Sequence, residues 1–190
     1  FVDPPVLDTA IGDRVYRLRS EDDVWPLDFR HVLAAAGGWI AGGPGRRWRL
    51  TPLGEGFLSA PASLQVWLLL ATWWVEVNWA VASPYEIPGD ELPARFCELV
   101  LDYLCDLPPG EPVPFAPFAG RLIEAAGLVW PIADQERGQS ILRALVERMV
   151  IDPLIVFEVL AADYGPHELL GGEYRQLSAF RVTPFGSSLL

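Results

Sequence analysis

Two segments of the chain carry the same order of residue types, and this repeat constrains the fold more than any other feature. Residues 48–54 read Trp-Arg-Leu-Thr-Pro-Leu-Gly, and residues 180–186 read Phe-Arg-Val-Thr-Pro-Phe-Gly. Both copies run aromatic, Arg, aliphatic, Thr, Pro, hydrophobic, Gly. Such self-similarity indicates two copies of one supersecondary unit within a single chain.

The repeated pattern predicts a strand that runs directly into a helix. Its first three positions alternate apolar and polar residues, as a half-buried strand does. Thr51 and Thr183 then stand where a helix N-cap would be, with a side-chain oxygen available to free backbone amides. Pro52 and Pro184 follow at the first helical position, where no amide hydrogen is needed. We therefore expect each Thr-Pro pair to cap a helix entered from the outer strand of a β-hairpin.

The residues before the first copy extend the pattern to a helix, a hairpin and a second helix. Residues 26–37 predict a short helix, which a pair of glycines ends. Residues 39–41 predict a strand, residues 42–45 a turn rich in Gly and Pro, and residues 46–50 the returning strand. The apolar side expected for the helix consists of Leu27, Val32, Leu33 and Ala36.

The second copy has the same layout with longer connections. The elements expected there are a helix over 95–104, a loop over 106–117, helices over 118–126 and 139–150, a strand over 154–160, a hairpin loop over 163–172 and a strand over 174–182. Both halves of the chain therefore predict the helix, strand, turn, strand and helix of a winged helix.

The predicted fold class is mainly α with small β-hairpins (α+β), as two winged-helix-like units joined by a long Trp-rich helix. That helix is expected over 62–80, and its Trp residues are expected to be buried between the units; the alternative is an interface with another part of the protein. Residues 1–82 form the expected first unit, 83–90 the linker and 91–190 the second unit. We expect the second unit to be truncated in its C-terminal helix, as in a fragment of a larger bacterial protein. The four Trp residues are Trp67, Trp73, Trp74 and Trp79.

The charge of the chain argues against broad, nonspecific binding to nucleic acid. The net charge is −11, and an acidic surface repels phosphate backbones. The charge is uneven: residues 1–80 hold seven Arg against nine acids, and residues 81–190 hold seven Arg against sixteen acids. Any nucleic-acid contact is therefore expected from the first half.

The strand-to-helix segment Arg-Leu-Thr-Pro-Leu-Gly resembles the end of the wing in bacterial winged-helix proteins of the MarR and PadR kind. It is also similar to winged-helix segments of helicase-associated bacterial proteins. The resemblance implies that the helix before the wing enters the DNA major groove and that the wing contacts the backbone or the minor groove. The candidate residues that it implies in the first unit are Arg30, His31, Arg46, Arg47 and Arg49.

Other readings of these residues stay open. The wing arginines can instead pair with acids on a solvated hairpin, and the helix over 26–37 is short and rich in Ala. In the second unit the equivalent residues are set in a strongly acidic half, which argues against DNA contact there. Those equivalent residues are Gln139, Arg143, Arg148 and Arg175.

Several kinds of site are not expected. The most apolar segment, 64–82, contains Gln65, Glu76 and Asn78, so it predicts a buried helix rather than a membrane span. Cys97 and Cys105 lie eight residues apart in a helical pattern, too far for a disulfide within one helix, and are expected to be buried thiols. His31 and His167 have no partners at catalytic or metal-binding spacing. No cofactor, metal or small-molecule substrate is expected.

Two hypotheses of function follow. The first is a non-catalytic, cytoplasmic interaction module that binds a protein partner or the remainder of its own chain. The alternative is a DNA-binding or regulatory module that grips double-stranded DNA through Arg46, Arg47 and Arg49. An enzyme is the least favoured reading, because no set of convergent ionisable residues is evident.

Overall fold

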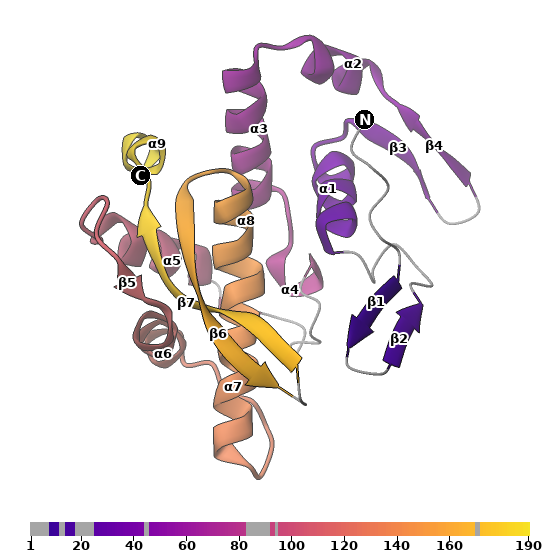
Figure 1. The fold of residues 1–190 in the computed structure, drawn as a ribbon. Coiled ribbons are helices and arrows are strands. Elements are labelled where there is room, and N and C mark those ends of the chain that lie inside the picture. Colours follow the sequence, from indigo (N-terminus) through magenta and orange to yellow (C-terminus); the bar gives the residue numbers. More distant parts are fainter. Residues whose placement is uncertain are drawn as a thin grey trace. The chain divides into compact units, whose positions relative to one another are not determined.

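The computed structural model supports the predicted α+β class (Figure 1). Helices hold most of the described residues, and the strands form small antiparallel sheets. The described residues are 8–11, 14–17, 25–43, 46–82, 92–93, 95–169 and 172–190. The expected linker, 83–90, lies outside them.

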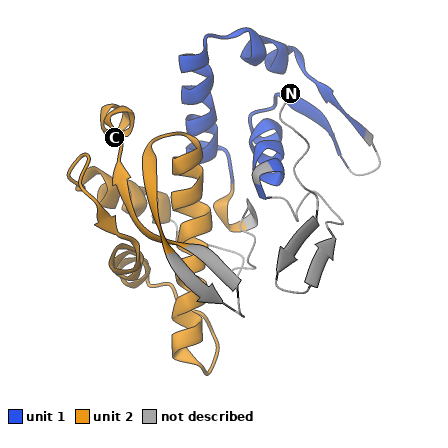
Figure 2. Ribbon diagram, viewed as in Figure 1, with its two compact units in different colours: residues 1–77, 166–175 blue, residues 78–165, 176–190 orange. Residues whose placement is uncertain are grey.

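The chain divides into two compact units (Figure 2). Unit 1 consists of residues 1–77 and 166–175, and unit 2 of residues 78–165 and 176–190. The division therefore falls within the long hairpin near the C-terminus: residues 166–175 belong to unit 1, and the residues on either side of them belong to unit 2. Each unit contains one copy of the repeated Thr-Pro segment.

The described residues of segment 1–77 in unit 1 form two antiparallel hairpins and three helices. β1 pairs with β2, and β3 pairs with β4. Its elements are β1 (Asp8–Ile11), β2 (Arg14–Arg17), α1 (Trp25–Ala36), β3 (Ile40–Gly43), β4 (Arg46–Leu50), α2 (Pro52–Ser59) and α3 (Ala62–Val75).

The Thr51 hydroxyl joins the end of α1 to the start of α2. It donates a hydrogen bond to the carbonyl oxygen of Gly38 (2.7 Å) and accepts one from the amide of Gly54 (3.0 Å). The Thr51 amide donates to the carbonyl oxygen of Trp39 (3.0 Å). One residue therefore ties together a helix end, the base of the hairpin and the first turn of the next helix.

Thr183 repeats this arrangement in unit 2. Its hydroxyl donates to the carbonyl oxygen of Glu158 (2.6 Å) and accepts from the amide of Gly186 (2.8 Å). Its amide donates to the carbonyl oxygen of Val159 (3.0 Å). The prediction that both Thr-Pro pairs cap a helix entered directly from a strand is confirmed. We call this set of bonds the threonine clasp.

The Gly of the repeated pattern is required by a close approach of two backbones. A Cβ atom on Gly54 would lie 2.1 Å from the carbonyl oxygen of Trp39, and one on Gly186 would lie 2.1 Å from that of Val159. Real side chains never come so near a backbone oxygen. The hairpin base can therefore pack against the first helical turn only where the third helical position has no side chain.

The helix before each hairpin also ends in the same way. Gly38 and Glu158 both adopt the left-handed conformation, with φ of 66° and 60°. The copies differ in hairpin length: Thr51 lies 12 positions after Trp39, but Thr183 lies 24 positions after Val159. The clasp is thus kept while the hairpin between its two ends varies in length.

Aromatic side chains build the core of unit 1. Phe29 of α1 meets Trp73 of α3 edge to face, with ring centroids 5.2 Å apart. Trp39 stacks on Phe57 of α2 at 4.0 Å. Phe29 and Leu33 are the buried side chains of α1, whereas Leu27, predicted on its apolar side, is exposed.

The corner between α2 and α3 is fixed by Gln65. Its side-chain amide donates to the carbonyl oxygens of Phe57 (3.0 Å), Leu58 (3.2 Å) and Ala60 (3.1 Å). The Phe57 carbonyl oxygen also accepts from the Ala60 amide (3.1 Å), and carbonyls at the end of a helix lack the amide four residues on that a continuing helix would supply. The polar residue in this apolar segment therefore sets the direction in which α3 leaves α2.

Unit 2 is a helical layer with a three-stranded sheet in the order β5, β7, β6. Phe118 of α6 and Phe180 of β7 are fully buried and meet edge to face at 4.9 Å. The elements of unit 2 are α4 (Trp79–Ala82), α5 (Phe96–Cys105), β5 (Val113–Pro114), α6 (Phe115–Ala126), α7 (Gln135–Val146), the π-helical turn η2 (Glu147–Ile151), α8 (Asp152–Val156), β6 (Leu160–Leu169), β7 (Gly172–Val182) and α9 (Pro184–Leu189).

The helix predicted over 62–80 is shorter than expected. α3 ends at Val75, and the short helix α4 begins after Asn78. The Asn78 side-chain oxygen accepts a hydrogen bond from the amide of Ala80 (3.0 Å), so it caps a new helix instead of continuing the old one.

The strand predicted over 154–160 is wrong. α7, η2 and α8 follow one another without a break, and the chain stays helical to Val156. The run of β-branched residues is typical of a strand, but Ile151 and Leu154 are buried as helical residues. Burial in the core of unit 2 therefore overrides the local preference.

The loop or short turn predicted over 106–117 is confirmed only as far as Pro112, and the hairpin loop predicted over 163–172 is wrong. The first contains β5 and the start of α6, and Val113 pairs with Phe180 of β7. The second lies largely in β6. There the Ser178 hydroxyl donates to the backbone of Asp163 (2.8 Å), and the Arg181 guanidinium donates to the Asp163 carboxylate (2.6 Å).

Replacing the clasp glycines by Ala should destabilise the unit that contains them. We expect Gly54→Ala and Gly186→Ala to lower the free energy of unfolding by about 3 kcal/mol or more, because the added Cβ overlaps a backbone oxygen. Gly56→Ala in α2 and Gly120→Ala in α6 are matched controls, because a Cβ there meets no atom within 4 Å. These should raise stability by about 0.5–1 kcal/mol. Urea unfolding followed by circular dichroism measures all four, and equal effects of clasp and control variants would contradict the account.

Candidate functional site

The residues predicted for DNA contact lie on α1 and β4 of unit 1. Arg30, Arg47 and Arg49 have exposed side chains. His31 is half-buried, and its ring meets the Trp48 ring edge to face at 4.3 Å. Arg46 lies on β4, but its side chain is outside the described part. His31 thus has a packing role that its sequence did not predict.

A β-bulge shapes the hairpin beside these residues. Ala41 pairs with Arg49 and Gly43 with Arg46, so β4 has one residue more than β3 between these pairs. A Cβ on Gly42 would lie 2.7 Å from the Trp48 ring. The Gly of the predicted turn therefore makes room for the indole that covers His31.

The candidates of unit 2 are distributed differently. Gln139 and Arg143 are exposed on α7. Arg148 donates to the Asp152 carboxylate at 2.8 Å, so an acid one turn away neutralises it. Arg175, which was predicted to belong to the second unit, lies on β7 in the segment 166–175 that belongs to unit 1, and its side chain is outside the described residues. The second unit therefore offers fewer unneutralised cations than the sequence indicated.

The π-helical turn gathers acids that the sequence analysis did not single out. The Asp152 amide donates to the carbonyl oxygen of Glu147, five residues earlier, and this wider turn brings the two side chains near each other. Burial raises the pKa of the Asp152 carboxyl, and Arg148 partly offsets that rise. Burial also raises the pKa of Glu147, with a further contribution from the charge of Asp152. Burial and the same two acids raise the pKa of Tyr164 on β6.

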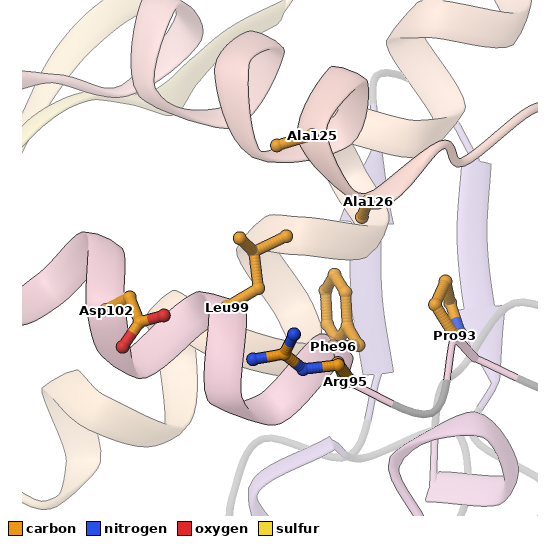
Figure 3. A pocket seen from close by; sticks show the side chains of 7 residues that line it. All are labelled: Pro93, Arg95, Phe96, Leu99, Asp102, Ala125 and Ala126. Atoms are coloured by element: carbon orange, nitrogen blue, oxygen red, sulfur yellow. The ribbon is translucent and has the colours of Figure 1, made fainter.

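A cavity of about 360 Å³ opens between α5 and α6 (Figure 3). Its walls are apolar, and its two charged lining residues are Arg95 and Asp102. Arg95 donates to Glu98 at 2.8 Å, and this bond is the main reason that its pKa is raised. The charge of Asp102, in the same lining, makes a smaller contribution to that rise. The apolar members of the lining include Phe96, Leu99, Ala125 and Ala126.

The two cysteines are both free thiols on α5. Cys97 is half-buried, and burial raises the pKa of its thiol. Cys105 is exposed, so its predicted burial is wrong; its thiol donates to the carbonyl oxygen of Leu190 at 3.5 Å. Within the described residues, no group of three or more His, Cys, Asp or Glu side chains could hold a metal ion. The side chain of His167 lies outside that part.

One side of α3 is apolar and exposed, contrary to the predicted burial of segment 64–82. Leu64 is 45% exposed and Val75 76%, and Leu68 and Ala71 between them are partly exposed. These four residues, which we call the α3 stripe, lie on one face of the helix. Trp67 beside them is 55% exposed, although it was expected to be buried.

The opposite side of α3 packs within unit 1. Trp73, opposite the stripe, is buried and contacts Phe29 of α1, and Thr72, beside the stripe, is also buried. A helix that is apolar all round is normally buried all round. α3 is apolar on both sides and uses one of them in its own unit. The sequence showed that this helix contains no charged residue. It did not show which side of the helix packs within unit 1 and which side stays exposed.

None of the described helices is long and apolar enough to cross a membrane. Comparison with protein-family models, with curated proteins and with solved structures found no match.

Replacing Glu147 by Gln should change stability in a pH-dependent way. Because the pKa of Glu147 is raised on folding, its stabilising contribution is full below the unfolded pKa and is lost as pH rises through the folded one. We therefore expect Glu147→Gln to be more stable than the parent at neutral pH, and this gain to vanish in acid.

Urea unfolding at pH 7 and at acidic pH measures this difference. Glu124→Gln, on the exposed side of α6, removes the same charge and serves as the control. A stability difference between Glu147→Gln and the parent that is the same at both pH values would contradict the account.

Proposed function

We propose that the chain is a non-catalytic bacterial interaction module, built from two winged-helix-like units and acting in the cytoplasm. Unit 1 binds a protein partner, or another part of its own chain, through α3. The observation that carries the proposal is the α3 stripe, an exposed apolar face on a helix whose other face is already packed.

Physical chemistry supports a protein as the partner. Apolar surface gains about 25 cal/mol for each Å² removed from water, so exposed Trp67 and Val75 favour any partner that covers them. Large aromatic residues are enriched in the centres of protein interfaces. The fourteen residues of α3 include no charged side chain that a partner would have to desolvate.

The winged-helix part of the proposal rests on the two threonine clasps. Each clasp joins a helix, a hairpin and a following helix in the order that a winged helix requires. The free thiols on α5 are compatible with a reducing compartment.

DNA binding by unit 1 is the second candidate. It is favoured by the exposed side chains of Arg30 on α1 and of Arg47 and Arg49 on β4, each of which can donate to phosphate oxygens. The net charge of −11 opposes it, because long-range repulsion weakens every phosphate contact.

Titration with duplex DNA at low salt separates the two candidates. We expect the parent chain to show no tight, salt-sensitive binding in fluorescence anisotropy. If it does bind, replacing Arg46, Arg47 and Arg49 by Glu should abolish binding and lower the salt slope. Arg121→Glu, on the exposed side of α6, is the control for a charge reversal elsewhere. Tight binding that the triple variant loses and the control keeps would replace the proposed function by the DNA-binding one.

A further inference from the structure

We infer that the occupant of the α3 stripe is a second copy of this chain, paired antiparallel about a two-fold axis between Leu68 and Ala71. This inference rests on the proposed function, since it names the partner of the same face. Three independent features of α3 point to it: the spacing of the stripe, the absence of charge and the nature of the two helix ends.

The spacing of the stripe is that of a helix-pairing seam. Leu64, Leu68, Ala71 and Val75 follow one another at intervals of four, three and four residues. Intervals of three and four keep side chains on one face and match the seam along which two helices interdigitate. The buried Trp73 lies on the opposite side, so pairing would leave the packing of α3 on α1 intact.

The order of these intervals, four, three and four, is the same when it is counted from either end of the helix. In an antiparallel pair, Leu64 therefore faces Val75 of the other copy, and Leu68 faces Ala71. Each layer combines a larger with a smaller side chain, which lets the helices approach closely. A two-fold interface requires this reciprocity: if Leu64 of one copy contacts Val75 of the other, then Val75 of the first copy must contact Leu64 of the second.

The absence of charged residues on α3 favours self-association through this helix. Two copies of a chain with net charge −11 repel one another over most of their surface. From Ala62 to Val75 there is no charged residue, so the pair brings no like charges together along the seam.

The ends of α3 favour the antiparallel direction. Pro61 at its N-terminus offers no side-chain cap to the first free amides, and exposed Glu76 stands at its C-terminus. With Leu64 opposite Val75, Glu76 of one copy lies beside the N-terminus of the other. A carboxylate is stabilising there. Parallel pairing would instead set the two Glu76 carboxylates side by side.

Sedimentation velocity of the whole chain tests the pairing. Over concentrations between about 1 and 300 μM, we expect a shift from monomer to dimer. Ala71→Glu should weaken the dimer at least tenfold, because it places two negative charges across the axis. Val75→Lys, at the most exposed position of the stripe, should weaken it with little risk to folding. Gln139→Glu adds the same charge as Ala71→Glu at an exposed position of α7 in unit 2 and should leave the dimer unchanged.

Cysteine cross-linking tests the direction. In a chain carrying Cys97→Ser and Cys105→Ser, we expect Leu64→Cys to form a disulfide with Val75→Cys when the two variants are mixed and oxidised. Each variant alone should cross-link poorly, because eleven residues at about 1.5 Å rise put like positions roughly 16 Å apart in an antiparallel pair.

The outcomes separate this inference from the proposed function. A chain that stays monomeric, a dimer that Ala71→Glu and Val75→Lys leave intact, or cross-links between like positions would each overturn the inference. If the monomeric chain also binds no duplex DNA, binding to a different protein still stands. Tight, salt-sensitive binding of duplex DNA by the parent chain would overturn the proposed function itself.

Discussion

One hydroxyl group in each unit holds the repeated structure together. Thr51 and Thr183 each donate to the end of the preceding helix and accept from the start of the next one. The Gly three residues later lets the helix approach the hairpin base to within contact of a backbone oxygen. Three of the four residues that are identical in the two copies, Thr, Pro and Gly, thus serve one purpose. Together they join two helices to the base of a hairpin at a fixed geometry.

In unit 1 the clasp helps to position the α3 stripe, the surface that we propose as functional. It sets the start of α2, and Gln65 then satisfies the carbonyls at the end of α2 and directs α3 away from it. Trp73 packs α3 onto α1 by its inner face, so the outer face carries apolar residues that unit 1 does not use. Exposure of an apolar face is unfavourable in water, and pairing with a protein relieves it.

The sequence predicted the features that local chemistry decides and missed those that distant contacts decide. The Thr-Pro caps, β4 and the helix before it were predictable, since capping and alternation depend on neighbouring residues. Residues 154–156 prefer strands locally, yet the core of unit 2 keeps them helical. The contact of His31 with Trp48 joins residues far apart in the chain. The apolar character of α3 was visible in the sequence, but the side that faces α1 was not.

Amide hydrogen exchange, followed by NMR, tests the clasp most directly. The amides of Thr51, Gly54, Thr183 and Gly186 each donate to a partner within the clasp. We expect all four to exchange as slowly as amides in the middle of α6, with similar protection in the two copies. Exchange of either pair at the rate of an unstructured peptide would contradict the view that the clasp holds the helix, hairpin and next helix together.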